Sequence, residues 1–192
     1  EQGYGYQFWL ARHGYRGDGA YGQFCVILPE QGAVLALTAC TENMQGVLDL
    51  AWQHLLPAFR SDADPAREAE LAERLAGLEL TPVAGAGGVP TGPLTFTAEP
   101  GAFEDLVDVT VTPEGDAHRL DLRFVDAAPA TVVVGDGRWV PGMLPGLGVP
   151  DVVVQASGGW SGDTFTAHLI VATSPHRLVL TARDASVEIG RA

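Results

Sequence analysis

Residues 3–38 read GYGYQFWLARHGYRGDGAYGQFCVILPEQGAVLALT, and this stretch decides the fold of the first third of the chain. Residues 4–11 carry apolar side chains on both faces, which predicts a central strand that is covered on both sides. Residues 24–28 and 33–38 are aliphatic runs joined by a short connection with Pro and Gly, which predicts an antiparallel hairpin. We therefore expect the last three strands of a sheet whose other half is absent from this chain.

Two helices are expected after this hairpin. Thr41 and Asn43 are both candidate N-caps of the first helix. The second helix starts with Asp64 as its cap and Pro65 at its first position, and Gly77 ends it. The first helix lies on the sheet, because apolar residues recur at spacings of three and four: Val47, Leu48, Ala51, Trp52, Leu55, Leu56 and Phe59.

Residues 82–93, PVAGAGGVPTGP, contain four Gly and three Pro, which predicts a linker. The residue pattern changes after this linker. Short alternating strands follow, with turn signals between them, and this pattern is typical of a barrel or sandwich. The predicted fold class is α+β, mainly β: a partial antiparallel sheet with a helix, then an antiparallel β-barrel. The predicted domains are 1–60, a helix and linker at 61–92, and a barrel at 93–192.

Residues 3–38 resemble the carboxyl-terminal strands of the β-lactamase and penicillin-binding-protein class of serine hydrolases. The turn GAYGQ stands where that class has its third active-site motif, K-T-G. By position, the resemblance gives Ala20 the Lys place, Tyr21 the Thr place and Gly22 the Gly place, and it makes the Gln23 amide an oxyanion donor. A glycine lets the backbone approach an oxyanion closely. Ala20 lacks the charge that holds a β-lactam carboxylate. For the complete hydrolase, the resemblance therefore implies action on an ester, amide or β-lactam bond, with esterase, amidase or peptidase activity at least as well supported as β-lactamase activity.

The S-x-x-K and Y-x-N motifs of this class are absent, and all 11 basic residues are Arg. The expected function is therefore that of a non-catalytic carboxyl-terminal portion of a serine hydrolase, completed by a missing amino-terminal part with the nucleophile.

Residues 152–187 resemble a lipocalin-like β module appended to some bacterial hydrolases of this group, with Trp160, Asp163-Thr164 and Pro175 as landmarks. The alternative is a free-standing β-barrel module for binding or oligomerisation.

The charge, the hydropathy and the residue spacing of the chain argue against nucleic acid, membranes and metal ions as partners. A formal net charge of −13 disfavours nucleic acid and anionic membrane surfaces. No apolar run reaches the length of a membrane-spanning helix. The five histidines and two cysteines show no metal-binding spacing, so no metal or cofactor is expected. The sequence does not choose between a cytoplasmic and a secreted location.

Three further expectations concern residues 1–60. Cys25 and Cys40 are predicted to be reduced core residues, with Leu28 opposite Val34 in the hairpin. Asp18 is predicted to form an ion pair with the neighbouring Arg16. The exposed sheet edge and apolar face predict a homo-oligomer joined through residues 1–60, since burial is worth about 25 cal/mol per Å².

Overall fold

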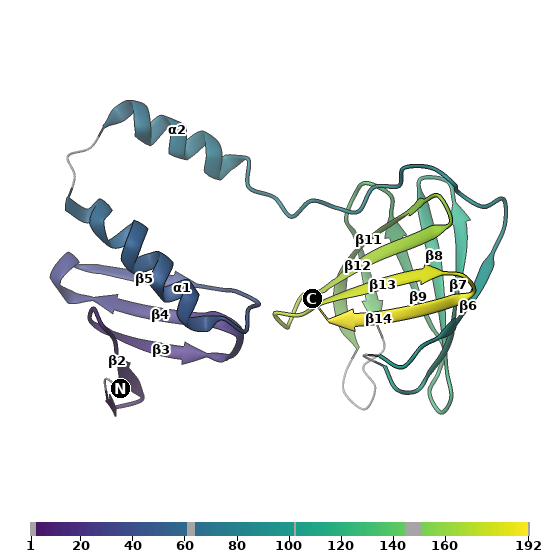
Figure 1. Ribbon diagram of the computed structural model, residues 1–192, viewed down its shortest axis with the longest axis horizontal. Helices are drawn as coiled ribbons and strands as arrows, with labels where there is room; N and C mark the ends of the chain where they lie inside the picture. The colour runs from purple at the N-terminus through teal and green to yellow at the C-terminus, as the bar shows by residue number, and fades with distance from the viewer. Residues whose placement is uncertain (1–2, 61–63, 102, 145–150, 192) are drawn as a thin grey trace. The chain divides into compact units, whose positions relative to one another are not determined.

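The computed structural model describes residues 3–60, 64–101, 103–144 and 151–191. The chain divides into two compact units, Glu1–Glu79 and Leu80–Ala192 (Figure 1). The first unit is a small antiparallel sheet with helices, and the second is a closed β-barrel. The predicted class, α+β and mainly β with an antiparallel barrel, is confirmed.

The sheet of the first unit has five strands in sequence order, each antiparallel to the next. They are β1 (Tyr4–Gly5), β2 (Phe8–Leu10), β3 (Tyr15–Gly19), β4 (Gln23–Leu28) and β5 (Ala33–Leu37).

The predicted central strand at residues 4–11 is wrong. The chain reverses at Tyr6 and Gln7, whose φ angles of 52° and 68° are left-handed, and β1 and β2 form a small hairpin at the sheet border. Their apolar side chains pack on each other: the Tyr4 and Trp9 rings lie 4.6 Å apart. Both faces of this segment are apolar because the side chains of its two short strands pack on each other, and not because other elements cover the strand on both sides.

The hairpin of β4 and β5 forms as predicted, but its register differs by one residue. Leu28 pairs with Ala33, because the turn has its left-handed residue at Gly32 (φ 58°). The side chains of β4 alternate between the core and solvent, so Cys25 is exposed, and Cys40 is exposed as well. The prediction that both cysteines are core residues is therefore wrong.

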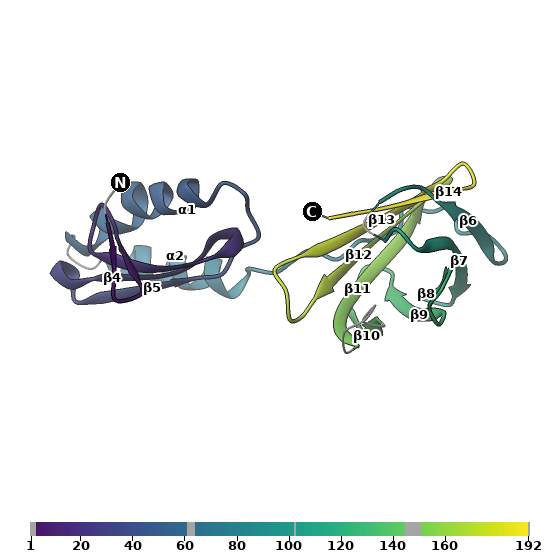
Figure 2. The same cartoon turned by 90° about the horizontal axis from the view of Figure 1, so that it is seen from below.

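Helix α1 (Met44–Leu50) continues through a π-helical segment (Ala51–Leu55) and a 3-10 segment (Leu56–Arg60). Asn43 caps it, since its Oδ1 accepts a hydrogen bond from the Gly46 amide at 3.0 Å. Figures 1 and 2 show α1 lying across one face of the sheet. The core between helix and sheet consists of Phe24, Val26, Leu28, Leu48, Ala51 and Trp52.

Helix α2 (Pro65–Ala76) has the predicted ends. Asp64 Oδ1 accepts from the Ala66 amide at 3.0 Å, and the Gly77 amide donates to the Glu73 carbonyl at 3.1 Å. Every residue of α2 is exposed, so the helix buries no apolar face.

The barrel is one sheet whose pairings are antiparallel except those of β14 with β6 and of β11 with β9. It closes where β11 meets β9 as well as β10, and where β14 meets β6 in parallel. Because nine consecutive strands alternate in direction, the first (β6) and the last (β14) point the same way and therefore pair in parallel. The strands are β6 (Leu94–Ala98), β7 (Leu106–Glu114), β8 (Ala117–Phe124), β9 (Ala130–Gly135), β10 (Val140–Leu144), β11 (Val152–Ser161), β12 (Thr164–Val171), β13 (Arg177–Arg183) and β14 (Ser186–Arg191).

Aromatic side chains fill the barrel. The Trp160 and Phe165 rings lie 5.2 Å apart, and Phe96 lies 6.2 Å from Trp160. All three are at most 5 % exposed. Trp139 is not part of this core, because its Nε1 donates to the Leu80 carbonyl at 2.7 Å.

Residues 80–88, hereafter the strap, run along the barrel. The Gly and Pro content of residues 82–93 predicts a linker over most of this segment, yet its backbone forms hydrogen bonds to the barrel in several places. The Gly85 amide donates to Asp136 Oδ1 at 2.6 Å, and the Ala86 amide donates to the Trp160 carbonyl at 2.8 Å. The Val83 carbonyl accepts from the Ser157 hydroxyl at 3.0 Å. The glycines allow the close contact, since a Cβ on Gly85 would lie 2.7 Å from Asp136 Oδ2.

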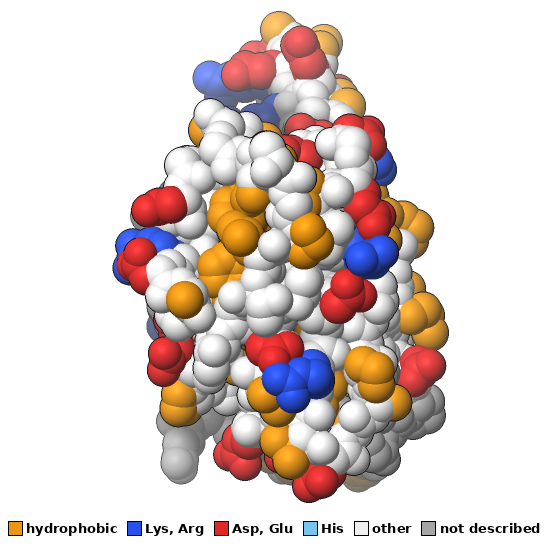
Figure 3. Space-filling model, turned by 90° about the vertical axis from the view of Figure 1, so that its right-hand side faces the viewer, with side chains coloured by type: hydrophobic (Ala, Val, Ile, Leu, Met, Phe, Trp, Pro, Cys, Tyr) orange, Lys and Arg blue, Asp and Glu red, His pale blue; other side chains and the backbone are white. Residues whose placement is uncertain are grey.

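Acidic side chains are spread over the barrel face seen in Figure 3 and do not gather in one patch. Within the described ranges, no helix is both long and apolar enough to cross a membrane.

Candidate functional site

The candidate residues from Ala20 to Gln23 form a tight reversal between β3 and β4. Ala20–Gly22 is a single 3-10 turn, in which Tyr21 and Gly22 have left-handed φ angles of 61° and 86°. Gln23 begins β4 and pairs with Gly19. The structure thus brings the four predicted residues together, at the turn between two inner strands of the sheet.

The turn is held by the connection that follows β5. The Thr41 amide donates to the Tyr21 carbonyl at 3.1 Å, and Gln23 Nε2 donates to the Ala39 carbonyl. Gly22 is buried, and a Cβ there would lie 3.1 Å from Thr41 Cγ2 and 3.2 Å from Ala39 Cβ. The space left by the missing side chain of Gly22 is therefore filled by the protein, and this packing fixes the backbone of the turn.

The chemistry that the turn offers is limited to binding and polarisation. Ala20 and Tyr21 are exposed, and Gln23 is half-buried with its side-chain amide engaged. Arg16 Nε lies 2.8 Å from Asp18 Oδ1, which confirms the predicted ion pair and ties up the nearest carboxylate. The backbone amides of such a turn are the groups that could orient a substrate or stabilise an oxyanion.

Among the described residues of this unit, the sheet face opposite α1 is apolar and partly exposed. Tyr15 pairs with Ile27, which pairs with Val34, so the three side chains share one face. Their neighbours on that face are Cys25 and Ala36. Val34 is 64 % exposed and Tyr15 is 38 % exposed. None of these five positions carries a charged side chain. An exposed apolar surface of this kind is typical of a surface that contacts another protein segment.

No spacing in the sequence distinguishes one histidine from the others, but His118 has a distinct environment in the structure. It is 2 % exposed inside the barrel, and its Nε2 lies 3.8 Å from Asp136 Oδ2. Burial lowers the pKa of His118, and the nearby Asp136 carboxylate only partly offsets this. The alternation of His118 with apolar residues on its strand is the one sequence signal for its inward orientation.

No group of three His, Cys, Asp or Glu side chains suited to a metal ion occurs in the part of the chain that the structure describes. Comparison of the chain with protein-family models, with curated proteins and with solved structures found no significant match.

Proposed function

We propose that residues 1–60 form one wall of the active site of an acyl-serine hydrolase related to β-lactamases and penicillin-binding proteins. The nucleophile of that hydrolase lies on another segment of the same protein. The observation that carries this proposal is the one-sided sheet: α1 covers one face, while Tyr15, Ile27 and Val34 leave an apolar face without cover in the unit.

The turn from Ala20 to Gln23 supplies the binding part of the site in this proposal. Its backbone is fixed by residues 39–41, so its amides are held in place before a substrate arrives. Preorganised backbone donors stabilise developing negative charge because they need no reorganisation during the reaction. With Ala20 in the Lys place, the parent enzyme acts on an ester, amide or β-lactam bond without a lysine contact to the substrate from this turn.

The barrel is an accessory domain in this account. Its core is closed by the contacts among Phe96, Trp160 and Phe165, so it does not depend on the first unit for its packing. A second candidate function is homo-oligomerisation through residues 1–60, and the same uncovered face favours it, since a second copy would also bury those side chains.

Hydrolysis assays of this chain with nitrocefin and with p-nitrophenyl acetate test the proposal. We expect no turnover above the buffer blank, because the turn carries neither a nucleophile paired with a base nor a lysine. Turnover that follows the protein through purification, and that is lost in a Tyr21→Phe variant, would contradict a non-catalytic role. Analytical ultracentrifugation of the same sample separates the second candidate, since only oligomerisation requires a particle larger than one chain.

A further inference from the structure

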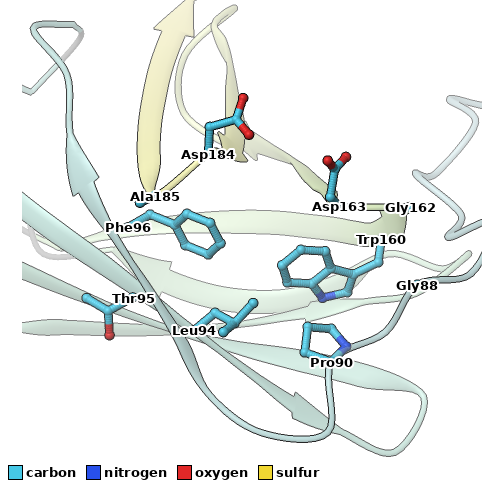
Figure 4. A pocket seen from close by; sticks show the side chains of 10 residues that line it. All are labelled: Gly88, Pro90, Leu94, Thr95, Phe96, Trp160, Gly162, Asp163, Asp184 and Ala185. Atoms are coloured by element: carbon cyan, nitrogen blue, oxygen red, sulfur yellow. The ribbon is translucent and has the colours of Figure 1, made fainter.

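A pocket of 540 Å³ lies at one end of the barrel (Figure 4). Its volume falls within the range of small-molecule sites, about 300–1,000 Å³. Four separate segments build it: the end of the strap with Pro90, the start of β6, the β11–β12 turn and the β13–β14 turn. The lining residues are Gly88, Pro90, Leu94, Thr95, Phe96, Trp160, Gly162, Asp163, Asp184 and Ala185.

The middle of the pocket is aromatic and contains an unsatisfied donor. Trp160 is 1 % exposed, and its Nε1 has no hydrogen-bond partner among the described residues. Figure 4 shows this nitrogen turned toward the side of the pocket where Pro90 and Leu94 lie. A buried donor without a partner costs about 1–3 kcal/mol, so an acceptor atom that reached it would be favoured.

The other side of the pocket is acidic. Figure 4 shows the carboxylates of Asp163 and Asp184 beyond the two rings, away from Pro90. Asp184 is paired with Arg183 at 3.3 Å, whereas Asp163 has no ion-pair partner in the described part of the chain. Asp163 is exposed, and among the described residues its Oδ1 accepts a hydrogen bond from the Thr164 hydroxyl alone, at 3.3 Å. One uncompensated negative charge therefore stands at the edge of an aromatic pocket.

The β13–β14 wall of the pocket is fixed before any ligand binds. Asp184 and Ala185 form a hairpin turn in which both residues are left-handed (φ 50° and 65°), and the Thr97 amide donates to the Ala185 carbonyl at 2.9 Å. Preorganised walls reduce the entropic cost of binding.

We propose that this pocket binds a small organic ammonium compound. Its apolar body lies against Phe96 and Trp160, an acceptor atom at its inner end takes the Trp160 Nε1 hydrogen, and its cationic group lies beside Asp163. This assignment is independent of the hydrolase proposal, because every residue that carries it belongs to the barrel.

The test is a titration of the whole ¹⁵N-labelled chain with 4-methoxyphenethylamine, followed by ¹H–¹⁵N correlation spectra. This probe has a ring, an ether oxygen and an ammonium group. Phenethylamine lacks the acceptor, and 3-(4-methoxyphenyl)propanoate carries the opposite charge. A Trp160→Phe variant identifies the indole signal of Trp160. Asp163→Asn removes the proposed charge contact, and Asp126→Asn removes an exposed acid outside the pocket as a matched control.

We expect saturable binding that moves the Trp160 indole signal downfield, and no such downfield movement with phenethylamine. Asp163→Asn should weaken binding about two- to fivefold, as expected for an exposed ion pair, while Asp126→Asn leaves it unchanged. Binding of the propanoate as tight as that of the amine, or shifts confined to residues outside the pocket, would overturn the proposal. Absence of any saturable shift with millimolar amine would overturn it as well. If Trp160→Phe fails to fold, the comparison between the two Asp→Asn variants still decides.

Discussion

Gly85 donates its amide hydrogen to Asp136 Oδ1 at 2.6 Å, and this bond joins the strap to the end of β9. A Cβ on Gly85 would lie 2.7 Å from the other carboxylate oxygen of Asp136 and 3.0 Å from the Trp160 carbonyl. The strap is thus part of the barrel, and Gly85 is required for the close backbone contact.

Gly85→Ala should lower the free energy of unfolding of the barrel by about 1–3 kcal/mol, the usual cost of overpacking. Denaturant unfolding followed by the Trp160 indole signal measures this. Gly92→Ala is the matched control, because a Cβ there meets nothing within 4 Å. Equal stability of the two variants would show that the strap is not packed as described.

The stability of the barrel should fall as the pH is lowered below the ordinary histidine pKa of about 6.5. Burial lowers the pKa of His118 in the folded state, so the unfolded chain binds protons first and stability is lost between that pH and the lower folded pKa. Burial also lowers the pKa of His168, with a smaller contribution from Arg177, and acts in the same direction. Below both folded pKa values these two histidines cause no further loss.

The charged and aromatic groups that face His118 are Asp136 and Phe165. A His118→Gln variant should therefore show a weaker pH dependence of unfolding in this window, measured by denaturant titrations at a series of pH values. His54→Gln, which removes an exposed imidazole from the other unit, should leave the dependence unchanged. An unchanged slope in His118→Gln would contradict the assignment.

Gly22→Ala should destabilise the first unit more than Gly32→Ala does. Both glycines have left-handed φ angles, and this backbone conformation costs a residue with a Cβ about 1–2 kcal/mol. Only Gly22 is also crowded, by Thr41 and Ala39, whereas a Cβ on Gly32 meets nothing within 4 Å. Hydrogen exchange of the β4 amides in the two variants measures the difference. Equal protection in both would mean that residues 39–41 do not hold the turn.

If a second copy covers the exposed sheet face, Val34→Glu should turn the assembly into single chains. Val34 is 64 % exposed, so a charge there costs the folded unit little but would be buried in the contact. Sedimentation velocity at micromolar concentration measures the particle size. Val153→Glu places the same charge on a 44 % exposed barrel position and should change nothing. Loss of assembly in both variants alike would point to a general charge effect.

The sequence predicts the parts of this fold that depend on contacts between residues close together in the chain. The caps are local features: Asp64 is predicted correctly, and Asn43 is one of the two candidates that the sequence offers, with Thr41 as the other. The alternation of β7 and β8 is a property of single strands and is also predicted. The hairpin register depends on one left-handed residue, Gly32, and a shift of one position changes the cross-strand partner of Leu28 from the predicted Val34 to Ala33.

The strap and the barrel-end pocket illustrate what the sequence does not reveal. Gly and Pro at residues 82–93 have the composition of a linker, and only the distant partners of the strap, Asp136 and Trp160, show that its backbone is bonded. The pocket is assembled from four segments that no sequence pattern connects. The turn from Ala20 to Gln23 forms where it is expected, but its support by Thr41 is a tertiary contact.

Activity-based labelling of the complete product of the gene tests the central claim most directly. The product is treated with a fluorophosphonate probe, and the modified residue is located by mass spectrometry. We predict that the label lies on a serine outside residues 1–192, within an S-x-x-K motif. Labelling of a serine within these residues, or no labelling of a product that is folded, would contradict the account.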